Sequence, residues 1–258
     1  MCEILVYRSF QRSVKDRIAV IEAYLGHIQE VRLLKDQYKY RLFWYLGALN
    51  SATSFLALVN SHREARSDMQ KNILWTGIEY YSLENCILTI SDKGSEIASS
   101  IIGAYANELY RVEYRIQTDQ YWETIFFEIK TQLYNTMEIT SFRKEGKENW
   151  YVNGQPDEKF SGCIDIDISL TPFTNTLPIN RLKLSEKESG QIMVVYVDIL
   201  GRKTMPVQQK YTRLSHTGYK YENVPNDFES VITVDDLGLV VKYPGLFERT
   251  FITESNYR

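Results

Sequence analysis

Alternation of apolar and polar residues dominates the chain from Ile73 onward. In residues 110–117 tyrosine, valine and isoleucine alternate with charged or amide side chains, and the next segment repeats the pattern through Ile125, Phe127 and Ile129. A period of two residues is typical of strands that bury one face and expose the other. These segments therefore predict neighbouring half-buried β-strands.

Turn signals divide the remaining sequence at strand-like intervals. Asn153-Gly154, directly after an aromatic segment, is the strongest hairpin signal, because both central residues of such a turn need positive φ. Residues 192–199 are apolar on both faces apart from Asp198, which indicates a strand inside a core or beside an apolar cavity. No long helical pattern separates these strands, so the sequence excludes a βαβ architecture. It favours a mainly β fold, a many-stranded antiparallel β-roll or barrel.

The first seventy residues have a different pattern. Ile18, Ile21, Leu25 and Ile28 recur at helical spacing, and a second apolar stripe runs through residues 42–59, so we expect an α-helical hairpin before the β domain. Residues 42–61 carry no charge and are long enough to span a bilayer. Their amide and hydroxyl side chains favour docking of an amphipathic helix over insertion into a membrane.

Composition excludes several functions. The net charge of −3 and the pI near 5.8 argue against a nucleic-acid partner, which usually needs a basic patch. Three cysteines without metal-site spacing make a disulfide framework or a zinc site a poor interpretation. Residues 1–10 show no signal-peptide pattern, so we expect a cytoplasmic location, with membrane association through residues 42–61 as the alternative.

The most informative segment is residues 161–184. Asp165 and Asp167 alternate with three isoleucines and so share one face of a strand. A loop of hydroxyl and amide side chains follows, stiffened by Pro172 and Pro178. Arg181 comes next and could clamp an anionic head group or pair with one of the two aspartates.

These residue types suit hydrogen bonding to a polar head group. Residues 208–213 add a second polar set on a strand. The predicted ligand-binding residues are Asp165, Asp167, Thr171, Thr174, Asn175, Thr176, Arg181, Gln209 and Tyr211. Alternatively, the aspartates and the loop residues have a structural role, because such side chains commonly form hydrogen bonds with the nearby backbone. We expect no metal site, no cofactor and no catalytic residue, since the histidines are scattered and no nucleophile motif is present.

The motif TPFTNTLP at residues 171–178 carries a resemblance to a known family. Together with QQKYTRL at 208–214 and YPGLFERT at 243–250, it makes the chain resemble the family called putative glycolipid-binding, formerly a domain of unknown function. The resemblance begins near Trp75 and ends near Thr250. It implies a closed or spiral β-roll and a glycolipid ligand.

From these observations we expect three parts: a helical extension at 1–70, a β-roll at 73–250 and a tail at 251–258. The expected function is non-enzymatic binding of an amphiphile, a glycolipid or lipid, in the roll. One alternative is an enzyme that acts on a sugar or lipid head group through Asp165 and Asp167. Another is a scaffold that assembles through the helical hairpin. The sequence does not determine an oligomeric state.

Overall fold

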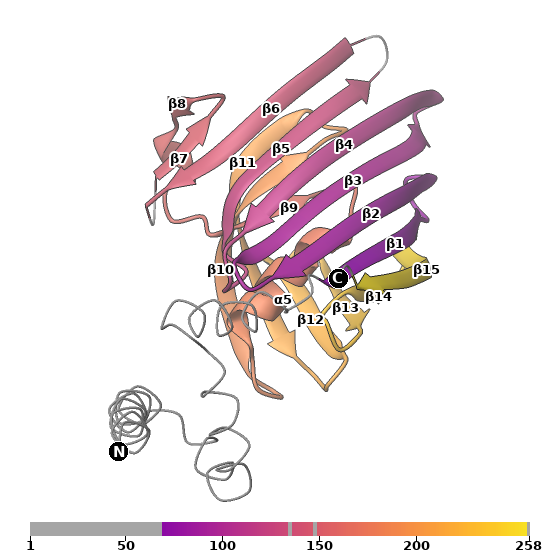
Figure 1. Cartoon of the computed structure of the whole chain (residues 1–258), viewed down its shortest axis with the longest axis vertical. Helices are drawn as coiled ribbons and strands as arrows, with labels where there is room; N and C mark the ends of the chain where they lie inside the picture. The colour runs from indigo at the N-terminus through magenta and orange to yellow at the C-terminus, as the bar shows by residue number, and fades with distance from the viewer. Residues whose placement is uncertain (1–68, 134–135, 147–148, 257–258) are drawn as a thin grey trace, which may run out of the picture. The chain divides into compact units, whose positions relative to one another are not determined.

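The computed structural model describes residues 69–133, 136–146 and 149–256, and these form one compact unit (Figure 1). The predicted helical hairpin and the uncharged segment 42–61 lie outside the described residues. The boundary predicted between an extension and a β domain therefore stays a prediction. Within the described residues the chain is mainly β, as the alternating pattern predicts, and its one α-helix is short.

Fifteen strands and one α-helix make up the part of the fold that lies within the described residues. The strands are β1 (Met69–Gly77), β2 (Ser82–Ser91), β3 (Gly94–Tyr105), β4 (Glu108–Thr118), β5 (Thr124–Leu133), β6 (Thr136–Glu145), β7 (Asn149–Val152), β8 (Gln155–Pro156), β9 (Asp165–Ile168), β10 (Ser189–Asp198), β11 (Lys203–Arg213), β12 (Gly218–Val224), β13 (Glu229–Val234), β14 (Val240–Tyr243) and β15 (Phe247–Asn256). The helix is α5 (Thr176–Leu182), and two 3-10 turns lie at Glu158–Phe160 and Phe173–Asn175.

All fifteen strands belong to one sheet. Its order is β8-β7-β6-β5-β4-β3-β2-β1-β15-β14-β13-β12-β11-β10-β9, so the first and last of the described strands meet in its middle. Neighbours are antiparallel except β9 and β10, which run parallel. The sheet ends at β8 and β9 and does not close on itself. The expectation of a closed barrel is therefore wrong, whereas that of an antiparallel many-stranded sheet is confirmed.

The two best alternating segments form strands, with one local difference. In β4 the residues expected to face inward, from Tyr110 to Ile116, are buried. In β5 Phe127 and Ile129 are buried but Ile125 is exposed, and the buried neighbour is Thr124. The register between β4 and β5 shifts just before this point, which skips Ile125 and turns it outward. A bulge of this kind cannot be read from the period of the sequence.

Two further local predictions are confirmed. Asn153 and Gly154 connect β7 to β8 with φ of 50° and 79°, as a tight hairpin turn requires. Strand β10 is covered on both faces, because Val194 packs into one hydrophobic cluster and Val195 into another. The apolar run at 192–199 therefore separates two cores and does not face an open cavity.

Residues 163–182, here called the inner segment, connect the two halves of the sheet. Residues 170–179 are all buried. Trp150 on β7 holds the start of the inner segment by donating from Nε1 to the carbonyl of Cys163 at 2.9 Å. In Figure 1, α5 lies between β2–β4 and the strands of the second half. The TPFTNT motif was expected to be a loop, but it forms a 3-10 turn that runs into α5. Pro178 fits there because the first turn of a helix needs no donor at that position.

Candidate functional site

The structure brings the sequence-predicted residues close together in several small hydrogen-bonded groups, and among them Thr176 alone has a hydroxyl without a hydrogen-bond partner within the described residues. They lie on β9, along the inner segment and on β11, and most of them are bonded to one another. The members are Asp165, Asp167, Thr171, Thr174, Asn175, Thr176, Arg181, Gln209 and Tyr211. Their contacts are with protein groups, and they line neither of the two hollows described below. Direct ligand binding by these nine residues stays a prediction.

Asp165 and Arg181 form an ion pair, the charged group among these residues. The Asp165 carboxylate is fully buried and accepts from Arg181 Nε at 3.0 Å on Oδ1 and from Nη2 at 2.5 Å on Oδ2. Burial raises the pKa of Asp165 above its usual value, and the Arg181 guanidinium acts in the opposite direction. Two aligned donors keep the carboxylate ionised. Of the two roles predicted for Arg181, the structure therefore shows pairing with an aspartate.

Asp167 lies two residues along the same strand but has neutral partners. Its Oδ1 accepts from Thr174 Oγ1 at 3.0 Å, and its Oδ2 accepts from Gln209 Nε2 at 2.7 Å. Burial raises the pKa of Asp167, and these two hydrogen bonds oppose the rise. A separate bond joins β11 to the inner segment, because Tyr211 donates to Asn175 Oδ1 at 2.8 Å. Asp165 thus ties β9 to α5 within the inner segment, and Asp167 joins that segment to β11 through Gln209.

A third buried carboxyl group, Glu84 on β2, was missed by sequence reasoning. Its Oε1 accepts from Tyr114 Oη at 2.6 Å, from Ser99 Oγ at 2.7 Å and from Thr171 Oγ1 at 2.9 Å. Its Oε2 is buried without a hydrogen-bond partner within the described residues. Burial raises the pKa of Glu84 to about 7, against the three hydrogen bonds that lower it. Through Thr171, Glu84 joins the inner segment to β2, β3 and β4.

The sequence did contain a signal for Glu84. Ser82, Glu84, Cys86 and Leu88 occupy alternate positions of β2, and all four are buried. Because Cys86 and Leu88 are apolar, the period of two places Glu84 on the same inward face. A charged residue in phase with a buried stripe is the pattern that could have identified it.

A cleft lies where several strand connections meet beside α5. Its volume is about 240 Å³. Three turns, at 119–123, 214–217 and 235–239, and the end of α5 surround it. The lining residues are Trp122, Ile179, Asn180, Lys183, Arg213, His216, Tyr219, Val234, Asp235, Asp236 and Gly238. We call this hollow the end cleft.

The walls of the end cleft are held in place by hydrogen bonds. The turn that carries Trp122 is fixed by Asp119, whose Oδ1 accepts from the backbone N–H groups of Tyr121 and Glu123. At the end of α5, Asn180 Nδ2 donates to the carbonyls of Thr176 and Leu237. A site assembled in this way needs little reorganisation when a ligand enters.

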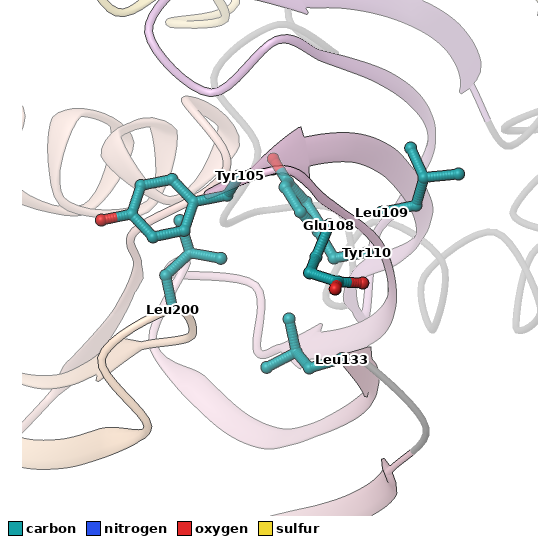
Figure 2. A pocket seen from close by; sticks show the side chains of 6 residues that line it. All are labelled: Tyr105, Glu108, Leu109, Tyr110, Leu133 and Leu200. Atoms are coloured by element: carbon teal, nitrogen blue, oxygen red, sulfur yellow. The ribbon is translucent and has the colours of Figure 1, made fainter.

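The second hollow is too small for an organic ligand. Its volume is about 20 Å³, room for one water molecule. Figure 2 shows Leu200, from the turn after β10, beside Tyr105 at the end of β3. Strands far apart in the sheet order therefore approach each other here. The other lining residues are Glu108, Leu109, Tyr110 and Leu133.

Other kinds of site find no support in the described ranges. Within residues 69–133, 136–146 and 149–256, no three His, Cys, Asp or Glu side chains are grouped so as to hold a metal ion. In the same part of the chain no helix is long and apolar enough to cross a membrane. Cys86 and Cys163 are buried free thiols, and burial raises the pKa of Cys163 to about 11. A thiol of that kind packs as a small apolar group.

Comparisons with known proteins point to one family. A family model described as "Putative glycolipid-binding" matches residues 72–249. A crystal structure of a DUF1089 family protein from Pseudomonas aeruginosa is similar at 30% identity and a TM-score of 0.59, over 64% of this chain and 91% of that one. A β-barrel-like protein of domain of unknown function DUF1849 from Brucella abortus matches at 5% identity and a TM-score of 0.41, over 74% and 98% of the two chains. The search of curated proteins finds no match.

Proposed function

This chain belongs to the family described as "Putative glycolipid-binding", and we propose that it binds a glycolipid or lipid without catalysing a reaction on it. The observation that carries the proposal is the mixed lining of the end cleft. Trp122, Ile179 and Val234 provide an apolar wall, while Asn180 and Lys183 provide polar groups. An apolar wall with a few placed polar groups is what an amphiphilic ligand requires.

The buried hydrogen bonds of the inner segment support this function indirectly. The Asp165–Arg181 pair and the Thr171–Glu84 bond fix the inner segment, and α5, at its end, forms one wall of the end cleft. In this arrangement the TPFTNTLP motif shapes the site from behind. It does not need to touch the ligand to be necessary for binding.

The enzymatic alternative has less support in the geometry. Asp165 is paired with Arg181, and Asp167 is bonded to Thr174 and Gln209. A pair of carboxyl groups that cleaves a glycosidic bond must flank that bond from two sides. Asp165 and Asp167 point from one strand into the protein, and neither lines the end cleft.

Native mass spectrometry of protein purified without detergent tests the proposal. We expect a co-purified lipid or glycolipid near one-to-one ratio, identified after organic extraction. If the freshly purified protein is free of lipid and takes up none from mixed vesicles, the binding function is wrong.

A further inference from the structure

The size of the end cleft limits what it can hold. Sites for drug-sized ligands have volumes of roughly 300–1,000 Å³. At about 240 Å³ the end cleft admits a single ring with its substituents, and an acyl chain must lie outside it. A ligand bound here would therefore present its polar end to the cleft.

The lining favours a ring with an apolar face and polar edges. Trp122 stands on one wall, and Ile179 and Val234 form apolar surface beneath. Asn180 uses its Nδ2 for two backbone carbonyls, whereas its Oδ1 accepts no hydrogen bond from the described residues. A sugar ring has this character, because its C–H face packs on an aromatic side chain and its hydroxyl groups donate to such an acceptor.

The charges at the rim favour an anionic ligand. Arg213 is held by the carbonyls of Leu184, Ser215 and His216, none of which neutralises its charge. Lys183 is exposed and forms no ion pair within the described residues. Two cations at one opening without a carboxylate partner attract a negative group.

Of the two acidic residues of the end cleft, Asp235 has a charged partner and Asp236 has an imidazole. Asp235 pairs with Arg249 at 2.5 Å and also accepts from two backbone N–H groups. Asp236 bonds His216 Nε2 at 2.9 Å at the exposed rim. The His216 imidazole cancels the charge of Asp236 only when it is protonated. Beside the Asp235–Arg249 pair, the lining therefore has two cations, Lys183 and Arg213, against the single carboxylate of Asp236, which leaves an excess of positive charge for a ligand.

From these observations we infer that the end cleft binds one anionic sugar ring, a sugar that carries a carboxylate, sulfate or phosphate. The ring packs on Trp122 and its negative group lies near Lys183 and Arg213. This inference rests on the proposed function and specifies its ligand class. The sugar could be the head group of a lipid or a free saccharide, and the test separates the two.

Isothermal titration calorimetry tests the ligand class with three soluble probes: methyl glucuronide, methyl glucoside and inorganic phosphate. We expect the glucuronide to bind more tightly than the glucoside, because only the glucuronide satisfies the two cations. The Lys183→Asn variant should weaken glucuronide binding about tenfold and leave the glucoside unchanged.

Lys187→Asn is the matched control. Lys183 and Lys187 are both exposed and both have positive φ, 48° and 70°, a conformation that asparagine tolerates. Lys187 does not line the end cleft, so its replacement should leave glucuronide binding unchanged. Equal weakening by the two variants would mean that only general surface charge acts, and the inference would be wrong.

The source of the sugar is tested with phosphatidylcholine vesicles that contain either glucuronosyl or monoglucosyl diacylglycerol. Binding to the first alone, lost in Lys183→Asn, supports a lipid head group, and binding of free methyl glucuronide alone supports a saccharide. Equal affinity for glucuronide and glucoside, or tighter binding of phosphate than of either, overturns the inference. Lipid uptake from these vesicles that Lys183→Asn does not weaken also overturns it while the proposed function stands. Absence of both lipid and probe binding rejects both.

Discussion

Two buried carboxyl groups in this protein are stabilised in different ways. Asp165, on the inner segment, has a guanidinium on both of its oxygens. Glu84, on β2, has three hydroxyl donors on one oxygen and none on the other. A guanidinium supplies a full opposite charge, whereas hydroxyl groups supply only dipoles. Burial raises the pKa of both groups, but at Asp165 a full opposite charge acts against the rise, whereas at Glu84 only dipoles do and the pKa reaches about 7.

The largest effect is expected from breaking the charged pair. Arg181→Met leaves the Asp165 carboxyl group buried without its counter-charge, and we expect a loss of about 3–5 kcal/mol in the free energy of unfolding. Urea denaturation followed by circular dichroism measures it. The double variant Asp165→Asn/Arg181→Met should regain part of that loss, because it buries no unpaired charge. A double variant that is less stable than Arg181→Met alone would contradict this account of the pair.

The second prediction concerns Glu84 and pH. Its pKa is about 7 in the folded protein and near 4.5 when exposed, so the folded state binds the proton more tightly. The stabilisation is complete below pH 4.5 and is lost as the pH rises through 7. The difference is about 3 kcal/mol in the free energy of unfolding.

The measurement is urea denaturation between pH 4.5 and 8.5 of the natural protein and of Glu84→Gln. Glutamine cannot ionise, so the difference between the two unfolding free energies isolates Glu84 from Asp165 and Asp167, whose pKa values burial also raises. The natural protein should lose stability relative to the variant as the pH rises. A difference that is constant with pH would show that Glu84 keeps one protonation state throughout.

Much of the fold could be predicted from the sequence, because burial on one face leaves a period of two. The strand at 110–117 was predicted in this way, and the Asn153-Gly154 turn was predicted because these two residues tolerate the positive φ that a tight hairpin needs. The outward turn of Ile125 could not be, since a bulge depends on the register against β4. The parallel pairing of β9 with β10 was equally hidden, because it joins segments that no local pattern connects.

The candidate site was predictable only in part. Alternation placed Asp165 and Asp167 on one strand face, and residue types suggested that Arg181 would pair with an aspartate. The end cleft was not predicted, because its walls come from three separate turns that only the folded sheet brings together. Trp122 and Lys183 are 61 positions apart in the sequence and carry no shared motif.

Tyr114→Phe sharpens the comparison with an intermediate effect. The change removes one hydroxyl donor from Glu84 Oε1 and its contact with Thr171 Oγ1 at 3.2 Å. We expect a loss of about 1–3 kcal/mol in the free energy of unfolding at pH 8 and a smaller loss at pH 5. A neutral carboxyl group needs the donor less than a carboxylate does, and the pH midpoint of Glu84 should therefore move upward. An equal loss at both pH values would contradict the assignment of charge.

The smallest effect is expected at Asp167, two residues from Asp165 on the same strand. In Asp167→Asn the amide oxygen can still accept from Gln209 Nε2, and no counter-charge is left behind, because Thr174 and Gln209 are neutral. We expect a change of about 1 kcal/mol or less in the free energy of unfolding, measured by the same urea denaturation as Arg181→Met. The lipid-bound fraction in native mass spectra should be unchanged. If instead this variant is as unstable as Arg181→Met, the loss in the free energy of unfolding depends on burial of the altered side chain. The loss of a charged partner would then not explain the effect of Arg181→Met.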